Sequence, residues 1–216
     1  MERYDQIAEL TDEFHVIHQK NRAPDGGGIS VASRLRIQQV HELDLHLTDR
    51  PREFAAGAVM VEVEAPEPLL FVNHFPSWQL DQESEREQQA VTVAREIDRL
   101  TSGRAAHVVV AGDMDADPSA TSIRFWTGRT SLGGMSVCYR DAWEARHPDE
   151  LGETFTPRNS LVADQDWPFR RIDYILVRCG LHGGPTLQIE RCERWLDEPV
   201  NGVWASDHFG VVAELV

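Results

Sequence analysis

The chain has 216 residues, 41% of them hydrophobic, which suits a single domain with a substantial core. Its 21 Lys and Arg residues and 36 Asp and Glu residues give a net charge of −15. This charge argues against an extended nucleic-acid-binding surface, because basic side chains bind phosphate backbones. No apolar run approaches the roughly 18 residues of a membrane span, so a transmembrane segment is not expected.

The first part of the chain predicts two helices and several strands. Apolar residues at helical spacing predict an amphipathic helix over residues 2–14, and a charged segment without glycine or proline predicts another over 82–100. Strands are expected at 15–19, 29–34, 57–64 and 69–75. The last of these is almost wholly apolar, which is typical of a strand buried on both faces.

The remainder of the chain is richer in strands. Residues 107–113 repeat the buried-strand pattern, and helices are expected after Pro118 and over 139–147, followed by a long loop at 148–170. Further strands are expected at 171–177, 185–190 and 209–215. Helix-covered strands predict a layered α/β architecture.

Acidic residues follow the strand at 107–113 directly. Asp113 and Asp115, in the segment Gly112-Asp113-Met114-Asp115, leave the expected sheet together, and close like charges raise a pKa or recruit a cation. Oxygen ligands suit Mg²⁺, Mn²⁺ or Ca²⁺ rather than Zn²⁺. A surface turn is the alternative interpretation, since Asp and Gly are turn residues.

Three other polar groups lie near strand ends. Asp207 and His208 are adjacent, which suits a metal or water contact beside a phosphate contact. Asp173 begins an apolar strand, where it could orient a histidine or pair with a neighbouring arginine. Asn73 and His74 end the strand at 69–75, where the imidazole could contact a phosphate or be structural.

The order of these groups carries a resemblance. The sequence resembles the endonuclease/exonuclease/phosphatase (DNase I-like) superfamily in four short motifs, which occur in the same order as in that family. They are VNHF, GDMDADP, RRIDYILV and ASDHFGV. The resemblance covers residues 28–215 and includes TFTP at 154–157. It implies an α/β fold of the four-layer α+β kind, with two packed mixed β-sheets flanked by helices, in a single domain over 1–216.

The resemblance also implies roles. Asp113 would activate the attacking water, His208 would contact the phosphate, and Asp173 would hold that histidine. His74 would be a second imidazole on the phosphate, and Asp115 would steady the pentacovalent phosphorus. Mg²⁺ or Mn²⁺ would be bound by Asp207, Asp113 and Asp115, and would offset charge on the substrate. The expected substrate contacts are Asn73, Asn159 and Arg171.

Two departures from the family pattern matter. Asp115 stands where the family often has Asn, and an ionised Asp cannot donate a hydrogen bond, which suggests a metal contact or a protonated acid. The family's first strands, which carry an Asn and a Gln-Glu pair, have no counterpart before Met1, and Glu2 lies within the expected helix. We therefore expect an N-terminally incomplete domain and an upstream start.

Three functions remain open. The first is a Mg²⁺-dependent phosphoesterase acting on a small-molecule or lipid-like substrate, and the second is the same chemistry on DNA or RNA, which the acidic charge disfavours. The third is a degenerate domain that binds a phosphorylated ligand or a partner without turnover. The sparse cysteines, without metal-type spacing, fit buried thiols in a reducing compartment, and the absence of a signal-peptide pattern favours a cytoplasmic location.

Overall fold

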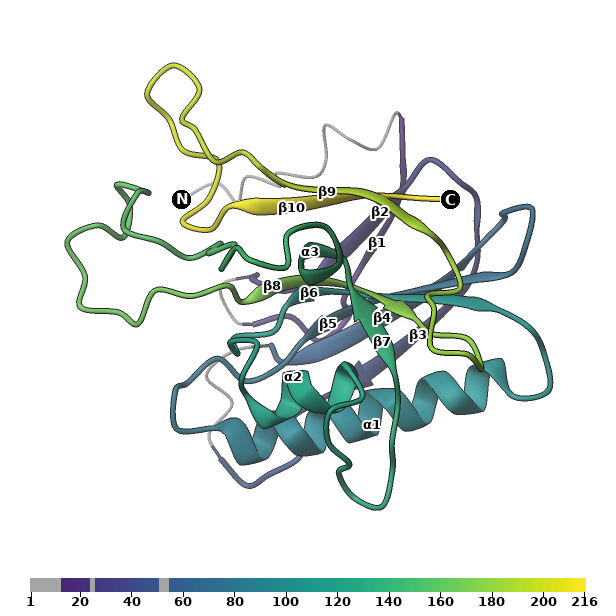
Figure 1. Ribbon diagram of the computed structural model, residues 1–216. Helices are drawn as coiled ribbons and strands as arrows, with labels where there is room; N and C mark the ends of the chain where they lie inside the picture. The colour runs from purple at the N-terminus through teal and green to yellow at the C-terminus, as the bar shows by residue number, and fades with distance from the viewer. Residues whose placement is uncertain (1–12, 24–25, 51–54) are drawn as a thin grey trace.

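A mixed six-stranded sheet forms the centre of the molecule (Figure 1). The computed structural model describes residues 13–23, 26–50 and 55–216. The strand order is β3-β4-β5-β6-β8-β7, in which β5 and β6 run parallel and the other neighbours run antiparallel. The strands are β3 Ile37–Asp44, β4 Gly57–Val63, β5 Leu69–Phe75, β6 His107–Asp113, β7 Tyr139–Asp141 and β8 Asp173–Arg178.

Two helices cover one face of this sheet (Figure 1). They are α1, Glu83–Thr101, and α2, Thr121–Trp126. Ala90, Val93, Ala94 and Ile97 recur at helical spacing along α1 and are buried in the main core, which also includes Val110 of β6. The apolar stripe of α1 thus explains which face of the helix meets the sheet.

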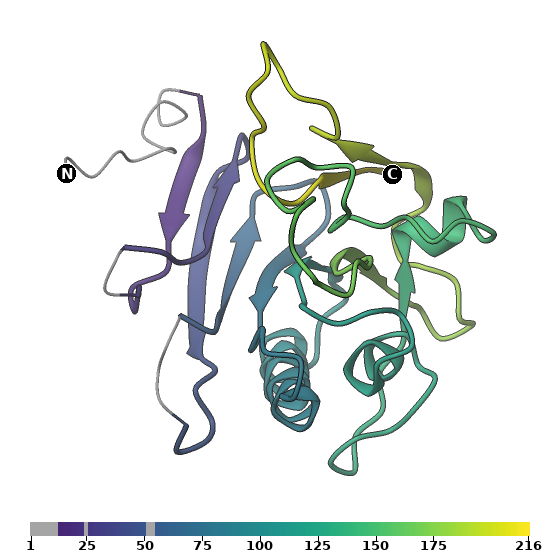
Figure 2. The ribbon, with the colours of Figure 1, turned by 90° about the vertical axis from the view of Figure 1, so that its left-hand side faces the viewer.

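Two separate two-stranded sheets lie on the opposite face (Figure 2). One pairs β1, His15–His18, with β2, Ser30–Ser33; the other pairs β9, Ile189–Trp195, with β10, Gly210–Leu215. Val31 of β2 packs with Val59 of β4, and Ile189 of β9 shares a cluster with Val177 of β8 and the short helix α3, Ala142–Arg146.

Between the two small sheets, no other described element covers part of the central sheet. A groove of about 590 Å³ is lined by side chains of β5, β6 and β8 on its floor and of β10 on one wall. The apolar lining residues are Leu69, Phe71, Val109, Ala111, Ile175, Leu187, Val211, Ala213 and Leu215. The groove ends at Asp113 and Asp173, so an apolar channel leads to a pair of carboxyl groups.

The α/β class and most expected elements are confirmed, with four differences. The second sheet is divided into two pairs, and β3, an edge strand rich in polar residues, was not expected from the sequence. The segment 139–147 divides into β7 and α3, and β9 begins four residues later than expected. The predicted helix at 2–14 lies almost wholly outside the described residues. None of the described helices has the length and apolar character of a membrane span.

Candidate active site

Two carboxyl groups face each other across neighbouring strands. Asp113, the last residue of β6, is the register partner of Asp173, the first residue of β8. Directly opposite residues on antiparallel strands project from the same face of a sheet, so the pairing brings two acids together. Gly112 permits this geometry, because its φ of 146° and the carbonyl oxygen of His74, 2.3 Å from where a Cβ would lie, leave no room for a side chain.

His208 completes the cluster. Its Nδ1 lies 3.1 Å from Oδ2 of Asp173 and 3.7 Å from Oδ2 of Asp113. Two hydrogen bonds to Ser206 hold the loop that carries His208. The His208 amide donates to Oγ of Ser206, and the Asn159 side-chain amide donates to the Ser206 carbonyl oxygen. The imidazole is therefore presented to the carboxyl groups by a braced loop.

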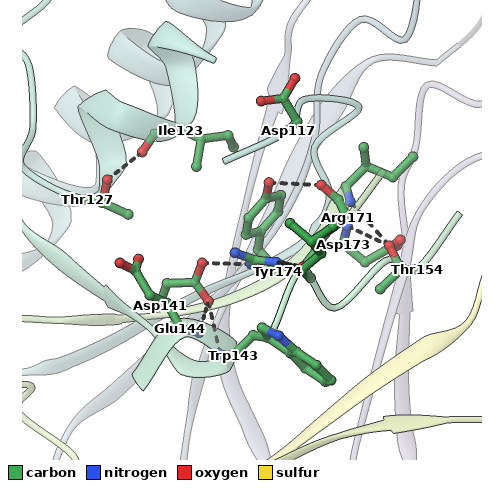
Figure 3. Close-up of polar contacts among 12 residues, drawn as sticks. Asp117, Ile123, Thr127, Asp141, Trp143, Glu144, Thr154, Arg171, Asp173 and Tyr174 are labelled. Atoms are coloured by element: carbon green, nitrogen blue, oxygen red, sulfur yellow. Dashed lines mark hydrogen bonds and ion pairs between the residues drawn. The ribbon is translucent and has the colours of Figure 1, made fainter. Parts of the chain in front are cut away.

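Thr154 is a positioning residue that the sequence reasoning missed. Its Oγ1 accepts hydrogen bonds from the amides of Ile172 and Asp173, and its carbonyl oxygen accepts one from the amide of Phe209 (Figure 3 shows the contacts with the β8 end). The side chain is fully buried. Thr154 thus joins the start of β8 to the His208 loop, and its position in the segment TFTP was the available signal.

The electrostatics of the cluster are coupled. Burial, together with the charges of Asp173 and Asp115, raises the pKa of Asp113 well above its ordinary value. Burial lowers the pKa of His208, but the hydrogen bond to Asp173 and the charges of Asp173 and Asp113 outweigh it and raise that pKa to about 9. His208 is therefore cationic at neutral pH, and it partly offsets the crowded negative charge.

The cluster fits a divalent cation. The ligand atoms of Asp113, Asp173 and His208 lie within 4.8 Å of one another, and the two carboxylates are the groups that would hold a cation while His208 stays protonated. Two carboxylates that raise each other's pKa gain from a cation, and Mg²⁺ is commonly held by one or two carboxylates together with water and substrate phosphate. The donor set therefore suits the Mg²⁺ or Mn²⁺ expected from the sequence.

The two other predicted metal ligands lie outside this group among the described residues. Asp115 has a φ of 49°, its amide donates to Asp113, and its Oδ2 is buried without a hydrogen-bond partner in the described part of the chain. Burial raises its pKa to about 6. Asp207 is exposed, and its carboxylate accepts a hydrogen bond from Ser206. Neither residue belongs to the compact group of Asp113, Asp173 and His208, and metal binding by Asp115 and Asp207 stays a prediction.

Two of the predicted substrate contacts have other roles. Arg171 is 5% exposed, and its guanidinium donates to Asp141 at 2.7 Å and to the Leu151 carbonyl at 3.2 Å, so it holds α3 and the following loop against β8 (Figure 3). Asn159 is fully buried, and both ends of its amide are engaged. The sequence could not distinguish these buried polar groups from groups that face a substrate.

Asn73 and His74 lie side by side in β5 but point to opposite faces. The Asn73 amide donates to the Ser30 carbonyl of β2, next to the acidic cluster's end of the sheet. His74 is buried on the helix side with its ring centroid 5.9 Å from that of Trp126, and burial lowers its pKa to about 3. The structure therefore makes His74 a neutral core residue rather than part of the cluster.

Aromatic side chains form a row beside the cluster. The ring centroid of Phe155 lies 5.0 Å from that of His208, Trp167 lies 6.3 Å from Phe155, and Trp78 lies 6.3 Å from Trp167. Phe155 is buried, whereas Trp78 is exposed. The long loop at 148–170 thus meets the segment that follows β5 and carries an aromatic surface away from the carboxyl groups.

Comparison with known proteins identifies the family of the chain. The model of the Endonuclease/Exonuclease/phosphatase family matches residues 2–208, and the chain belongs to that family. No curated protein matches the chain by sequence.

Solved structures share the fold at low identity. A humanized TDP2 from D. rerio superposes with a TM-score of 0.73 at 16% identity, covering 97% of this chain and 79% of that one. An endonuclease/exonuclease/phosphatase from Bacteroides vulgatus gives 0.69 at 17% identity, with 97% and 78% covered. The human Nocturnin catalytic domain, solved with a bound sulfate anion, gives 0.68 at 14% identity, with 99% and 77% covered.

Proposed function

We propose that the protein is a metal-dependent phosphoester hydrolase in which water, activated at Asp113, attacks phosphorus. The observation that carries the proposal is the cluster of Asp113, Asp173 and His208, with Nδ1 of the histidine 3.1 Å from one carboxylate and 3.7 Å from the other. Membership in the Endonuclease/Exonuclease/phosphatase family supports the same chemistry.

Each side chain has a distinct task in this proposal. Asp113 takes the proton of the attacking water, and its raised pKa makes it a better base than an ordinary Asp. His208, held cationic by Asp173, donates a hydrogen bond to a phosphoryl oxygen as negative charge accumulates there. Asp113 and Asp173 would hold Mg²⁺ or Mn²⁺, which would supply polarisation of a phosphoryl oxygen.

We also propose that the groove beside the cluster is a binding site for an extended, apolar segment of the protein. The groove is apolar along its length, is flanked by two small sheets with unpaired edges among the described strands, and ends at Asp113 and Asp173. An upstream pair of strands with alternating apolar residues would fill it and would add an acidic ligand to the site. Upstream coding sequence without such strands and without an acid at their end would refute this extension.

The preferred substrate is a small-molecule or lipid-like phosphoester, because the net charge of −15 opposes a polyanion. A nucleic-acid substrate is the second candidate, since the row of Phe155, Trp167 and Trp78 could stack on bases. A related structure, TDP2 of D. rerio, was solved in complex with single-strand DNA product. The aromatic row and the fold likeness support this second candidate, and the acidic net charge opposes it.

Turnover of one phosphodiester, with two others as competitors, tests these alternatives. We expect Mn²⁺-dependent hydrolysis of bis(4-nitrophenyl) phosphate, abolished by EDTA and by D113N. Stronger competition by glycerophosphocholine than by single-stranded DNA would support the small or lipid-like substrate, and the reverse would support nucleic acid. If W167A weakens only the competition by DNA, the aromatic row binds bases. Ligand binding without any turnover would instead indicate a degenerate binding domain.

A further inference from the structure

Two cysteines outside the active site lie opposite each other at the edge of the central sheet. In the β7–β8 ladder Tyr139 pairs with Arg178 and Arg140 pairs with Val177, so the same register places Cys138 opposite Cys179. The Cys179 amide donates to the Cys138 carbonyl oxygen at 2.9 Å, which continues the ladder by one more residue pair. Directly opposite residues of this kind have Cα atoms about 5.5 Å apart, within the range that a disulfide spans.

The two thiols are also coupled electrostatically. Both cysteines are free, and Cys138 contributes to the raised pKa of Cys179. Cys138 is exposed and Cys179 is half-buried. Gly128 sets the position of Cys138 from the other side, since a Cβ at Gly128 would lie 3.2 Å from the Cys138 Sγ. One accessible thiol is thus held against one sheltered thiol.

We propose that Cys138 and Cys179 form a reversible cross-strand disulfide when the protein meets a peroxide. The accessible Cys138 sulfur attacks one peroxide oxygen, the O–O bond breaks, and the released hydroxide takes a proton to form water. The Cys179 sulfur then attacks the Cys138 sulfenic acid, which forms the S–S bond and breaks the S–O bond, and a second water leaves with the Cys179 proton. Two thiols are oxidised by two electrons, and one peroxide is reduced to two waters.

The order of attack follows from the surroundings of each sulfur. Burial, followed by the influence of the neighbouring Cys138, raises the pKa of Cys179 to about 11, so Cys179 stays protonated. The exposed Cys138 is left to meet the oxidant. Cys192 is buried, and lies in the cluster of Val177 and Ile189 rather than at this edge, which makes it an internal control.

The disulfide would tie an edge strand to the sheet. It would close a loop that contains α3, the long loop at 148–170, Arg171 and Asp173, so oxidation would restrict the unfolded chain. We expect the Tm of the oxidised protein to rise by about 5 to 10 °C and to return on reduction by dithiothreitol.

Thiol counting by mass spectrometry tests the proposal. The folded chain is treated with hydrogen peroxide, quenched, denatured and alkylated with iodoacetamide. We expect the treated protein to have lost two hydrogens and to carry one alkyl group, at Cys192. The untreated protein should carry three alkyl groups, one on each cysteine. The control C192S should lose the same two hydrogens and take no alkyl group, whereas C138S and C179S should form no internal disulfide.

Three outcomes would overturn the proposed disulfide between Cys138 and Cys179. They are alkylation of all three cysteines after oxidation, a disulfide that includes Cys192, and oxidation of Cys138 to a sulfinic acid without loss of the Cys179 thiol. Because the readout is mass and Tm, the result is independent of the proposed hydrolase activity.

Discussion

His74 offers a quantitative check of the structure, because burial alone lowers its pKa to about 3 from an ordinary value of 6.5. The side chain is 2% exposed, and its Nδ1 is buried without a hydrogen-bond partner among the described residues. The folded protein should therefore keep the imidazole neutral at pH values where the unfolded chain protonates it. Below pH 6.5 the unfolded state binds more protons, so this residue makes stability fall as the pH decreases toward 3.

The size of the effect follows from the two pKa values. Between about pH 7.5 and about pH 5, a folded pKa of about 3 and an unfolded pKa of about 6.5 give a loss of roughly 2 kcal/mol in the free energy of unfolding. We expect His74→Leu to remove that loss, so wild type and variant should diverge by about this amount as the pH falls. Comparison with wild type cancels the contributions of the other titrating groups.

Urea unfolding at a series of pH values, followed by tryptophan fluorescence, measures the difference. His182→Asn is the matched control, because His182 is exposed and should leave the pH dependence unchanged. If His74→Leu follows the wild-type pH dependence within about 0.5 kcal/mol, the reasoning that His74 is a neutral core residue is refuted.

Three further predictions concern the site and its supports. Asp173→Asn should lower the pKa of His208 toward its ordinary value, as followed by NMR, and should reduce turnover by about 100-fold or more. Arg171→Met should cost about 3 to 5 kcal/mol in urea unfolding, because it leaves the Asp141 carboxylate buried without its partner. Gly112→Ala should lower the free energy of unfolding by about 1 to 3 kcal/mol, because the added methyl group would collide with the His74 carbonyl oxygen. It should also reduce turnover, because the backbone shift would displace the neighbouring Asp113.

A control variant or a contrary outcome checks each of these three predictions. Replacing Asp141 with Leu together with Arg171→Met should cost less than Arg171→Met alone, and an additive loss would contradict the buried pair. Gly184→Ala, where a Cβ would meet nothing within 4 Å, should leave stability nearly unchanged. An unshifted His208 pKa in Asp173→Asn would mean that Asp173 does not hold the histidine.

Buried strands were the most predictable part of the fold. Residues 69–75 and 107–113 are nearly continuous apolar runs, and they became β5 and β6 at the centre of the sheet. β3 escaped prediction because an edge strand is paired on one side only and tolerates the Gln, His and Glu residues of Ile37–Asp44. Its assignment depended on pairing with β4, which the local pattern of residues 37–44 does not reveal.

The site was predictable where the acid ends a strand. Asp113 and Asp173 were identified from the ends of apolar runs, and the structure pairs them in register. Arg171 could not be placed, because the choice between a substrate and the buried Asp141 is made by tertiary packing. The role of Thr154 was hidden for the same reason, since its partners lie 18 and 19 residues away in the chain.

If a further segment of the protein fills the groove, the measured activity depends on whether that segment is present in the assay. The chain should therefore be assayed both as the 216 residues and in a form extended by any upstream coding sequence. An increase in activity on extension, with both forms folded, would support the groove proposal.

The most direct test of the central claim is hydrolysis of bis(4-nitrophenyl) phosphate with Mn²⁺ or Mg²⁺, then with EDTA, by both forms and by D113N. The cluster of Asp113, Asp173 and His208 predicts turnover that requires the metal and is lost in D113N. Absence of metal-dependent turnover in both folded forms, or full activity in D113N, would contradict the assignment of this cluster as a phosphoester hydrolase site.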